Sequence, residues 1–164
     1  MNLLRLTAAT VAFSLLHAPL ATAQSGEHHS ASTVHFDKGE RHHISVFAGG
    51  TDITGESETA FTLGVDYEYR VNRILGLGFI AERAFGEIDS TTLFAVADIH
   101  LWRGLVTQLG TGVEISHGNT YFAARLGALY EFEVGEGFTL APQLHYDFSE
   151  EDSLVFGISI GRAF

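Results

Sequence analysis

The stretch 61–71, FTLGVDYEYRV, alternates apolar and polar residues without a break and decides the fold. Apolar residues occupy every odd position from Phe61 to Val71, whereas threonine, glycine, aspartate, glutamate and arginine fill the even positions. Successive side chains of a β-strand point to opposite faces, so this stretch predicts a strand with one apolar and one polar face. A period of two argues against an amphipathic helix, whose apolar residues recur every three to four positions.

Seven further segments alternate in the same way, with varying clarity. Their apolar faces begin near Ile44, Leu75, Leu93, Leu105, Phe122, Phe138 and Leu154. The connections 72–73, 103–104 and 135–137 are minimal turns, and those between them are generally longer and more acidic. Eight amphipathic strands at this spacing predict an all-β, up-and-down antiparallel meander. Closing the meander into an eight-stranded barrel removes its exposed edges.

The composition of the chain excludes cysteine chemistry and argues against nucleic-acid binding. The chain has 164 residues, which fits one domain. It has no cysteine, which excludes disulfides and cysteine-based metal or nucleophile sites. A formal net charge of −11 argues against nucleic acid as a partner, because phosphate contacts need a basic surface.

The first 41 residues do not alternate. Residues 1–23 combine one positive charge, a short apolar stretch and a small-residue end, so we expect a secretory signal peptide cleaved after Ala23. Residues 24–41 are polar and histidine-rich, and we expect a flexible segment there. The barrel domain is predicted to cover 42–164.

Two kinds of barrel fit the alternation: a soluble ligand-binding barrel of the lipocalin type, with its apolar face inward, and a transmembrane barrel, with that face in lipid. Three features favour the membrane. The polar face has many glycines and no lysine, whereas soluble surface normally carries mixed charges. Aromatic residues gather toward the strand ends, as at membrane interfaces. Runs of about 10–12 residues match the roughly 9–11 that a tilted strand needs to cross a bilayer.

The last strand, FGISIGRAF at 156–164, supports a family resemblance. Together with the alternation over about 42–164, it resembles the small eight-stranded bacterial outer-membrane barrels of the OmpA/OmpX type. The resemblance implies a monomer in the bacterial outer membrane, in contact with lipids and lipopolysaccharide and inserted by the barrel-assembly machinery. It also implies that the last strand presents the assembly signal, formed by Phe156, Ile158, Ile160 and Phe164. Arg162, on the side predicted to face lipid, is expected near the headgroups. The fold does not fix an activity.

Ionisable residues on the polar face are predicted to line the lumen. Hairpin registers place Arg125 beside Asp147, and Arg70 lies two residues from Glu68 on the same face. An eight-stranded barrel is just wide enough for side chains to fill it, so we expect ion pairs that plug the interior. The alternative is a narrow, porin-like cation-selective pore whose ion pairs exchange partners. The predicted lumen residues are Asp66, Glu68, Arg70, Glu82, Asp98, His100, Glu114, Arg125, Glu131, Glu133, His145 and Asp147.

Two motifs suggest catalysis or metal binding, and neither has convincing spacing. His145, Asp147 and Ser149 share one strand face, but same-face neighbours lie roughly 7 Å apart and Ser149 falls in a loop. Asp98 and His100 suggest a metal site with His145, yet strand direction separates these histidines. Histidines in the tail and at the start of the barrel are weak metal candidates: His28, His29, His35, His42 and His43.

The sequence thus predicts an integral outer-membrane barrel with a structural or surface-interaction role, no catalysis and no cofactor. The cation-selective pore is the first alternative. A lipid-modifying outer-membrane enzyme is the second, although no histidine–serine pair matches the lipid-facing arrangement of the outer-membrane deacylases. Acidic loop residues could also bind Ca²⁺ or Mg²⁺ shared with lipopolysaccharide phosphates.

Overall fold

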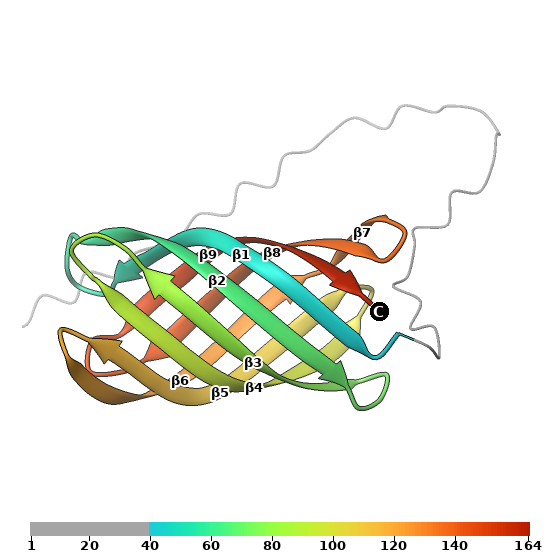
Figure 1. Cartoon of the computed structure of the whole chain (residues 1–164), viewed down its shortest axis with the longest axis horizontal. Helices are drawn as coiled ribbons and strands as arrows, with labels where there is room; N and C mark the ends of the chain where they lie inside the picture. Colours follow the sequence, from blue (N-terminus) through green and yellow to red (C-terminus); the bar gives the residue numbers. More distant parts are fainter. Residues whose placement is uncertain (1–39) are drawn as a thin grey trace, which may run out of the picture.

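The barrel is built from antiparallel strands that tilt steeply around a common axis (Figure 1). The computed structural model describes residues 40–164, so the predictions for 1–23, for most of 24–41 and for His28, His29 and His35 lie outside the described part. The strands are β1 (His42–Ile53), β2 (Thr59–Arg70), β3 (Leu75–Ala84), β4 (Ser90–Trp102), β5 (Leu105–Ser116), β6 (Asn119–Tyr130), β7 (Phe132–Gly135), β8 (Phe138–Phe148) and β9 (Ser153–Ala163). No helix in the described residues is long and apolar enough to cross a membrane.

Two pairings close the sheet on itself. Strand β1 pairs with both β2 and β9, and β6 pairs with both β5 and β8. Strand β7 continues β6 beyond Glu131 and pairs only with β8, as one arm of a hairpin that extends past the barrel. The predicted eight-stranded antiparallel barrel is therefore confirmed, with its sixth strand divided into β6 and β7.

The apolar face of every barrel strand points outward. Phe79 and Phe122 are 68% and 71% exposed, and Val46, Leu63 and Ile160 are also exposed on the outer surface. Such a continuous apolar exterior is unfavourable in water and favourable in hydrocarbon. The outward direction predicted from the alternation is therefore confirmed.

The inner face contains large apolar side chains as well as charges. Phe47, Ile80, Phe94, Val96 and Val155 are buried inside the barrel. Ile80, Phe94 and Val96 form one apolar cluster with Ala123. The alternation alone does not reveal this apolar filling, which packs beside the buried Arg125 guanidinium.

The two ends of the barrel differ. One end, here called the turn end, carries the connections 71–74, 103–104 and 136–137 together with Phe164 (Figure 1). The opposite loop end carries 54–58, 85–89, 117–118 and 149–152. The connection His117–Gly118 is as tight as Arg103–Gly104 at the turn end, and all four residues have positive φ. This left-handed pair is typical of two-residue hairpins, so the β5–β6 loop is shorter than expected.

Candidate functional site: the barrel lumen

The loop half of the lumen is crossed by the Arg125 triad, which consists of Arg125, Glu82 and Asp147. Arg125 Nε and Nη2 donate to Asp147 Oδ1 and Oδ2, both at 2.6 Å. Its Nη1 and Nη2 donate to Glu82 Oε1 at 2.9 Å and Oε2 at 2.5 Å. The hairpin register sets Arg125 opposite Asp147, whereas Glu82 reaches it from β3 across the lumen. Two bidentate contacts of this kind are strong and geometrically specific.

Apolar and polar neighbours enclose the triad. The Arg125 side chain is 0% exposed, and its guanidinium carbon lies 4.6 Å from the centre of the Phe94 ring. Phe94 thus offers the negative face of its ring to the cation. Nearer the turn end, Gln108 Nε2 donates to Asp98 Oδ1 at 2.8 Å, and both side chains are buried. The lumen is filled here by side chains that hold one another in place.

The turn end of the lumen holds a second group, the turn-end cluster, which consists of His43, Glu68, Arg70, His100 and Glu131. Arg70 Nη2 donates to Glu131 Oε2 at 3.0 Å, and Arg70 Nε donates to Glu68 Oε2 at 3.4 Å. His100 Nε2 donates to Glu68 Oε1 at 2.7 Å, and its Nδ1 lies 3.9 Å from Glu131 Oε2. Glu68 and Arg70 lie on β2, whereas Glu131 stands at the break between β6 and β7. These bonds therefore link opposite walls of the barrel.

Glycines make room for this cluster. A Cβ at Gly76 would overlap the Glu68 carboxylate, and a Cβ at Gly161 would overlap the His43 ring. His43 Nε2 is hydrogen-bonded to Thr139 Oγ1 at 2.9 Å, and His43 lies directly opposite Glu68 across β1 and β2. The glycines of the inner face therefore determine where the large polar side chains fit.

The remaining predicted lumen residues take different positions. Asp66 faces the lumen, and its Oδ1 is buried without a hydrogen-bond partner among the described residues. Glu114 is half-buried near the loop end. Glu133 is exposed on β7, beyond the enclosed lumen, because β7 has a neighbour on one side only. This position differs from the prediction, since the alternation continues past the end of the barrel.

The residues considered for catalysis do not form a relay. His145 Nε2 is hydrogen-bonded to Gln143 Oε1 at 3.1 Å, whereas Asp147 is held by Arg125. Ser149 Oγ has no hydrogen-bond partner among the described residues. The metal site considered for Asp98, His100 and His145 is not formed either. These three side chains contact Gln108, Glu68 and Gln143, respectively, and not one another.

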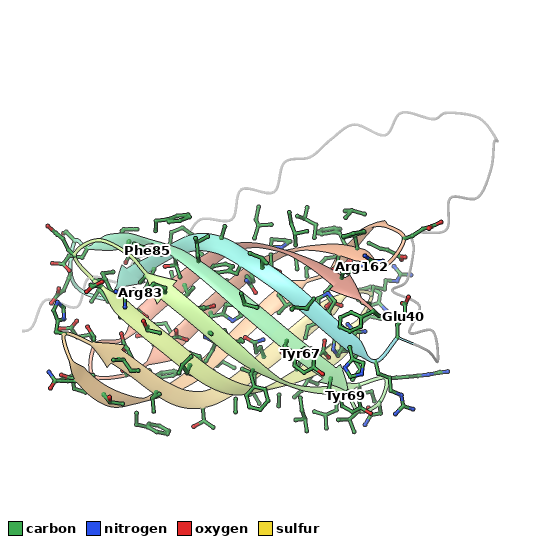
Figure 2. All side chains as sticks on the ribbon, viewed as in Figure 1. Glu40, Tyr67, Tyr69, Arg83, Phe85 and Arg162 are labelled. Carbon is green, nitrogen blue, oxygen red and sulfur yellow. The ribbon has the colours of Figure 1, made fainter. Side chains whose placement is uncertain are left out.

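Aromatic side chains mark both ends of the outer surface. At the turn end, His42 lies against Tyr67, Tyr69 and Phe164, with ring centres 5.3–6.0 Å apart. At the loop end, where Figure 2 labels Phe85, Phe61 stacks on that ring. Arg162 lies outside at the turn end, with its guanidinium carbon 5.2 Å from the Phe138 ring centre. These are the places where a membrane barrel meets the headgroups on either side.

Comparison with known proteins identifies the fold and no closer relationship. No protein-family model and no curated protein matches the sequence. Among solved structures, the N-terminal β-barrel domain of Pseudomonas aeruginosa OprF matches with a TM-score of 0.57 and 16% identity, over 76% of this chain and 99% of that chain. The Yersinia pestis outer membrane protein Ail in a phospholipid bilayer nanodisc matches with a TM-score of 0.53 and 12% identity, over 76% of this chain and 100% of that one.

Neisserial surface protein A shows the same relationship, with a TM-score of 0.52 and 12% identity over 75% of this chain and 96% of its own. Identities this low establish the architecture alone. The chain has the fold of the small eight-stranded outer-membrane barrels, and the resemblance drawn from the sequence is confirmed at that level.

Proposed function

We propose that this protein is an integral outer-membrane barrel with a structural or surface-interaction role and no catalysis. The observation that carries the proposal is the Arg125 triad, whose bidentate ion pairs join three strands across the lumen. An interior closed in this way favours a structural role over a conducting pore. The apolar exterior supplies the contact with outer-membrane lipids.

Fractionation of the cell envelope tests the location of the protein, and gel migration and Trp102 fluorescence test its insertion. We expect it in the outer-membrane fraction, with faster gel migration before heating than after, because a folded barrel resists detergent unfolding. Trp102 is the one tryptophan of the chain, and it is 68% exposed on the outer surface. Its fluorescence should therefore be quenched by lipids brominated near the headgroup. A detergent-free, compact monomer with unquenched Trp102 would contradict the proposal.

The loop end is the surface offered to the cell exterior in this proposal. Its connections are short and three of the four are acidic, which suits contact with cation-bridged lipopolysaccharide better than an extended recognition loop. The acidic loop residues are Glu56, Glu58, Glu87, Asp89, Glu150, Glu151 and Asp152. Insertion would be guided by the barrel-assembly machinery through the exposed residues of β9, which are Phe156, Ile158, Ile160 and Phe164.

A narrow cation-selective pore is the second candidate, and the acid excess of the lumen favours it. Asp66, Glu68, Asp98 and Glu131 gather toward the turn end, where Arg70 pairs with two of them. An acidic lining attracts cations. Planar-bilayer recordings separate the two candidates. We expect a flat baseline from the native protein, whereas discrete cation-selective steps would favour the pore.

A further inference from the structure

Barrel closure brings three metal-ligating side chains together at the turn end of the lumen. His43 comes from β1, Glu68 from β2 and Glu131 from the break between β6 and β7. Each offers one ligand atom, and these three atoms all lie within 4.8 Å of one another. The two carboxylates are buried and the imidazole is half-buried, so the group is largely shielded from bulk solvent.

A small cavity lies against these ligands. Its volume is about 20 Å³, which is enough for one water-sized occupant. His43, Glu68 and Glu131 line it together with Asp66, Asp98 and His100. Asp66 adds the buried Oδ1 that has no hydrogen-bond partner among the described residues. An unpaired carboxylate oxygen on the wall of a buried cavity is costly unless a proton or a cation meets it.

The charges around the cavity do not balance. Four carboxylates line it, and no lysine or arginine does so within the described part. Arg70 reaches two of these carboxylates from the side, with N–O distances of 3.0 and 3.4 Å. One guanidinium leaves a local excess of acid inside a barrel whose outer wall faces hydrocarbon. A divalent cation would offset two of these charges at once.

We propose that His43, Glu68 and Glu131 bind one divalent transition-metal cation, with Zn²⁺ as its representative. Zinc takes imidazole nitrogen and carboxylate oxygen at about 2.0–2.2 Å, which puts neighbouring ligand atoms about 3.4 Å apart in a tetrahedron. The three atoms lie within 4.8 Å of one another, so metal binding requires their side chains to rotate toward that spacing. The imidazole ligand favours zinc over calcium and magnesium, which prefer oxygen alone.

His100 orients one of the ligands. Its Nε2 donates to Glu68 Oε1 at 2.7 Å, and a hydrogen bond of this kind fixes the direction of a metal-binding carboxylate. Arg70 contacts both Glu68 and Glu131, so it competes with the metal for these carboxylates. The bound metal ties β1 and β2 to the β6–β7 junction, which adds a link across the lumen beyond the proposed structural role.

The experiment uses the full chain folded in detergent micelles, with His28, His29 and His35 replaced by asparagine to remove tail binding. Zn²⁺ affinity is measured by titration calorimetry, and visible absorption of added Co²⁺ reports the ligand geometry. His43→Gln and Glu131→Gln remove one ligand each. His42→Gln is the matched control, because His42 is the neighbouring residue on the outer face and contacts Tyr67. Heat-dependent gel migration shows that each variant is folded.

We expect one Zn²⁺ per chain, weakened at least tenfold by His43→Gln and by Glu131→Gln and unchanged by His42→Gln. Ca²⁺ should not compete at equal concentration. Should either ligand variant fail to fold, side-chain nitrogen resonances of His43 and His42 in the parent give the same answer, because only the first should shift on adding Zn²⁺. No saturable binding, or binding that His43→Gln leaves unchanged while the barrel is intact, overturns the site and leaves the proposed function standing.

Discussion

The Arg125 triad and the turn-end cluster use the same chemistry in different surroundings. Each sets one arginine between two carboxylates from different parts of the barrel wall. The Arg125 guanidinium makes bonds of 2.5–2.9 Å and its side chain is 0% exposed, whereas Arg70 makes bonds of 3.0–3.4 Å and its side chain is 12% exposed. Shorter contacts in a more enclosed setting make the first group the more rigid one.

The neighbours explain the contrast. Phe94 lies against the Arg125 guanidinium and forms an apolar cluster with Ile80 and Val96, and these groups offer no alternative partner to the ions. The turn-end cluster contains two histidines, and further carboxylates and a small cavity lie beside it. An ion pair with no alternative partner is fixed, while one among many polar groups can rearrange. The difference predicts that enclosure, more than the ion pair itself, determines how firmly this lumen is closed.

Replacing Arg125 by methionine is the largest test of this comparison. The change leaves Glu82 and Asp147 buried without their cation, so unfolding should become easier by about 3–5 kcal/mol. Urea titration of the barrel in lipid vesicles, followed by gel migration, measures the loss. Adding Glu82→Met and Asp147→Leu should recover most of it, because a well-packed apolar trio needs no counter-charge. A loss under about 1 kcal/mol would place the triad with ordinary surface ion pairs.

Arg70→Met is the parallel change at the turn end and should cost less, about 1.5–3 kcal/mol, the scale of charged hydrogen bonds. His100 still holds Glu68 after the substitution, and the cluster lies nearer to water. The same urea titration gives the comparison directly. If Arg70→Met destabilised the barrel as much as Arg125→Met, the distinction between a fixed and an adaptable group would be wrong.

Gly76→Ala tests whether the turn-end cluster can adjust. The added methyl overlaps the Glu68 carboxylate, which must rotate away from His100 or Arg70. Because the obstacle is the end of a flexible side chain, we expect about 1–2 kcal/mol of destabilisation, the lower part of the range for overpacking. Gly135→Ala is the matched control, since nothing lies within 4 Å of a Cβ there. Equal stability of both variants would show that the cluster needs no clearance.

Local parts of both groups could be predicted from the sequence. Alternation gives the inward direction of Arg125, Glu82 and Asp147, and the β6–β8 hairpin brings two of them together. The contact of Glu82 with Arg125 could not be predicted, because it depends on how far the strands shift on closing the barrel. Glu131 meets Arg70 for the same reason, across 61 residues of chain.

The apolar residues of the inner face are harder to predict from the alternation than its charged residues. Ile80, Phe94 and Val96 each stand among outward-facing apolar residues, so the polar half of the pattern disappears locally. Only the alternation of the flanking positions predicts that these three side chains point inward. Glu133 shows the opposite error. The alternation predicts that its side chain points inward, but the barrel has already ended at this position.

The smallest expected effect comes from an ion pair outside the lumen. Arg83, at the loop end (Figure 2), pairs with Asp89 and donates from Nη1 to Thr91 Oγ1 at 2.7 Å. Its side chain is 41% exposed and that of Asp89 is 58% exposed. Exposed pairs contribute about 0–1 kcal/mol, so Arg83→Met should change the urea midpoint little, and raising the salt concentration should not enlarge the effect. A cost near that of Arg125→Met would mean that pairing alone stabilises this barrel. A negligible cost would leave enclosure as the factor that separates the three arginines.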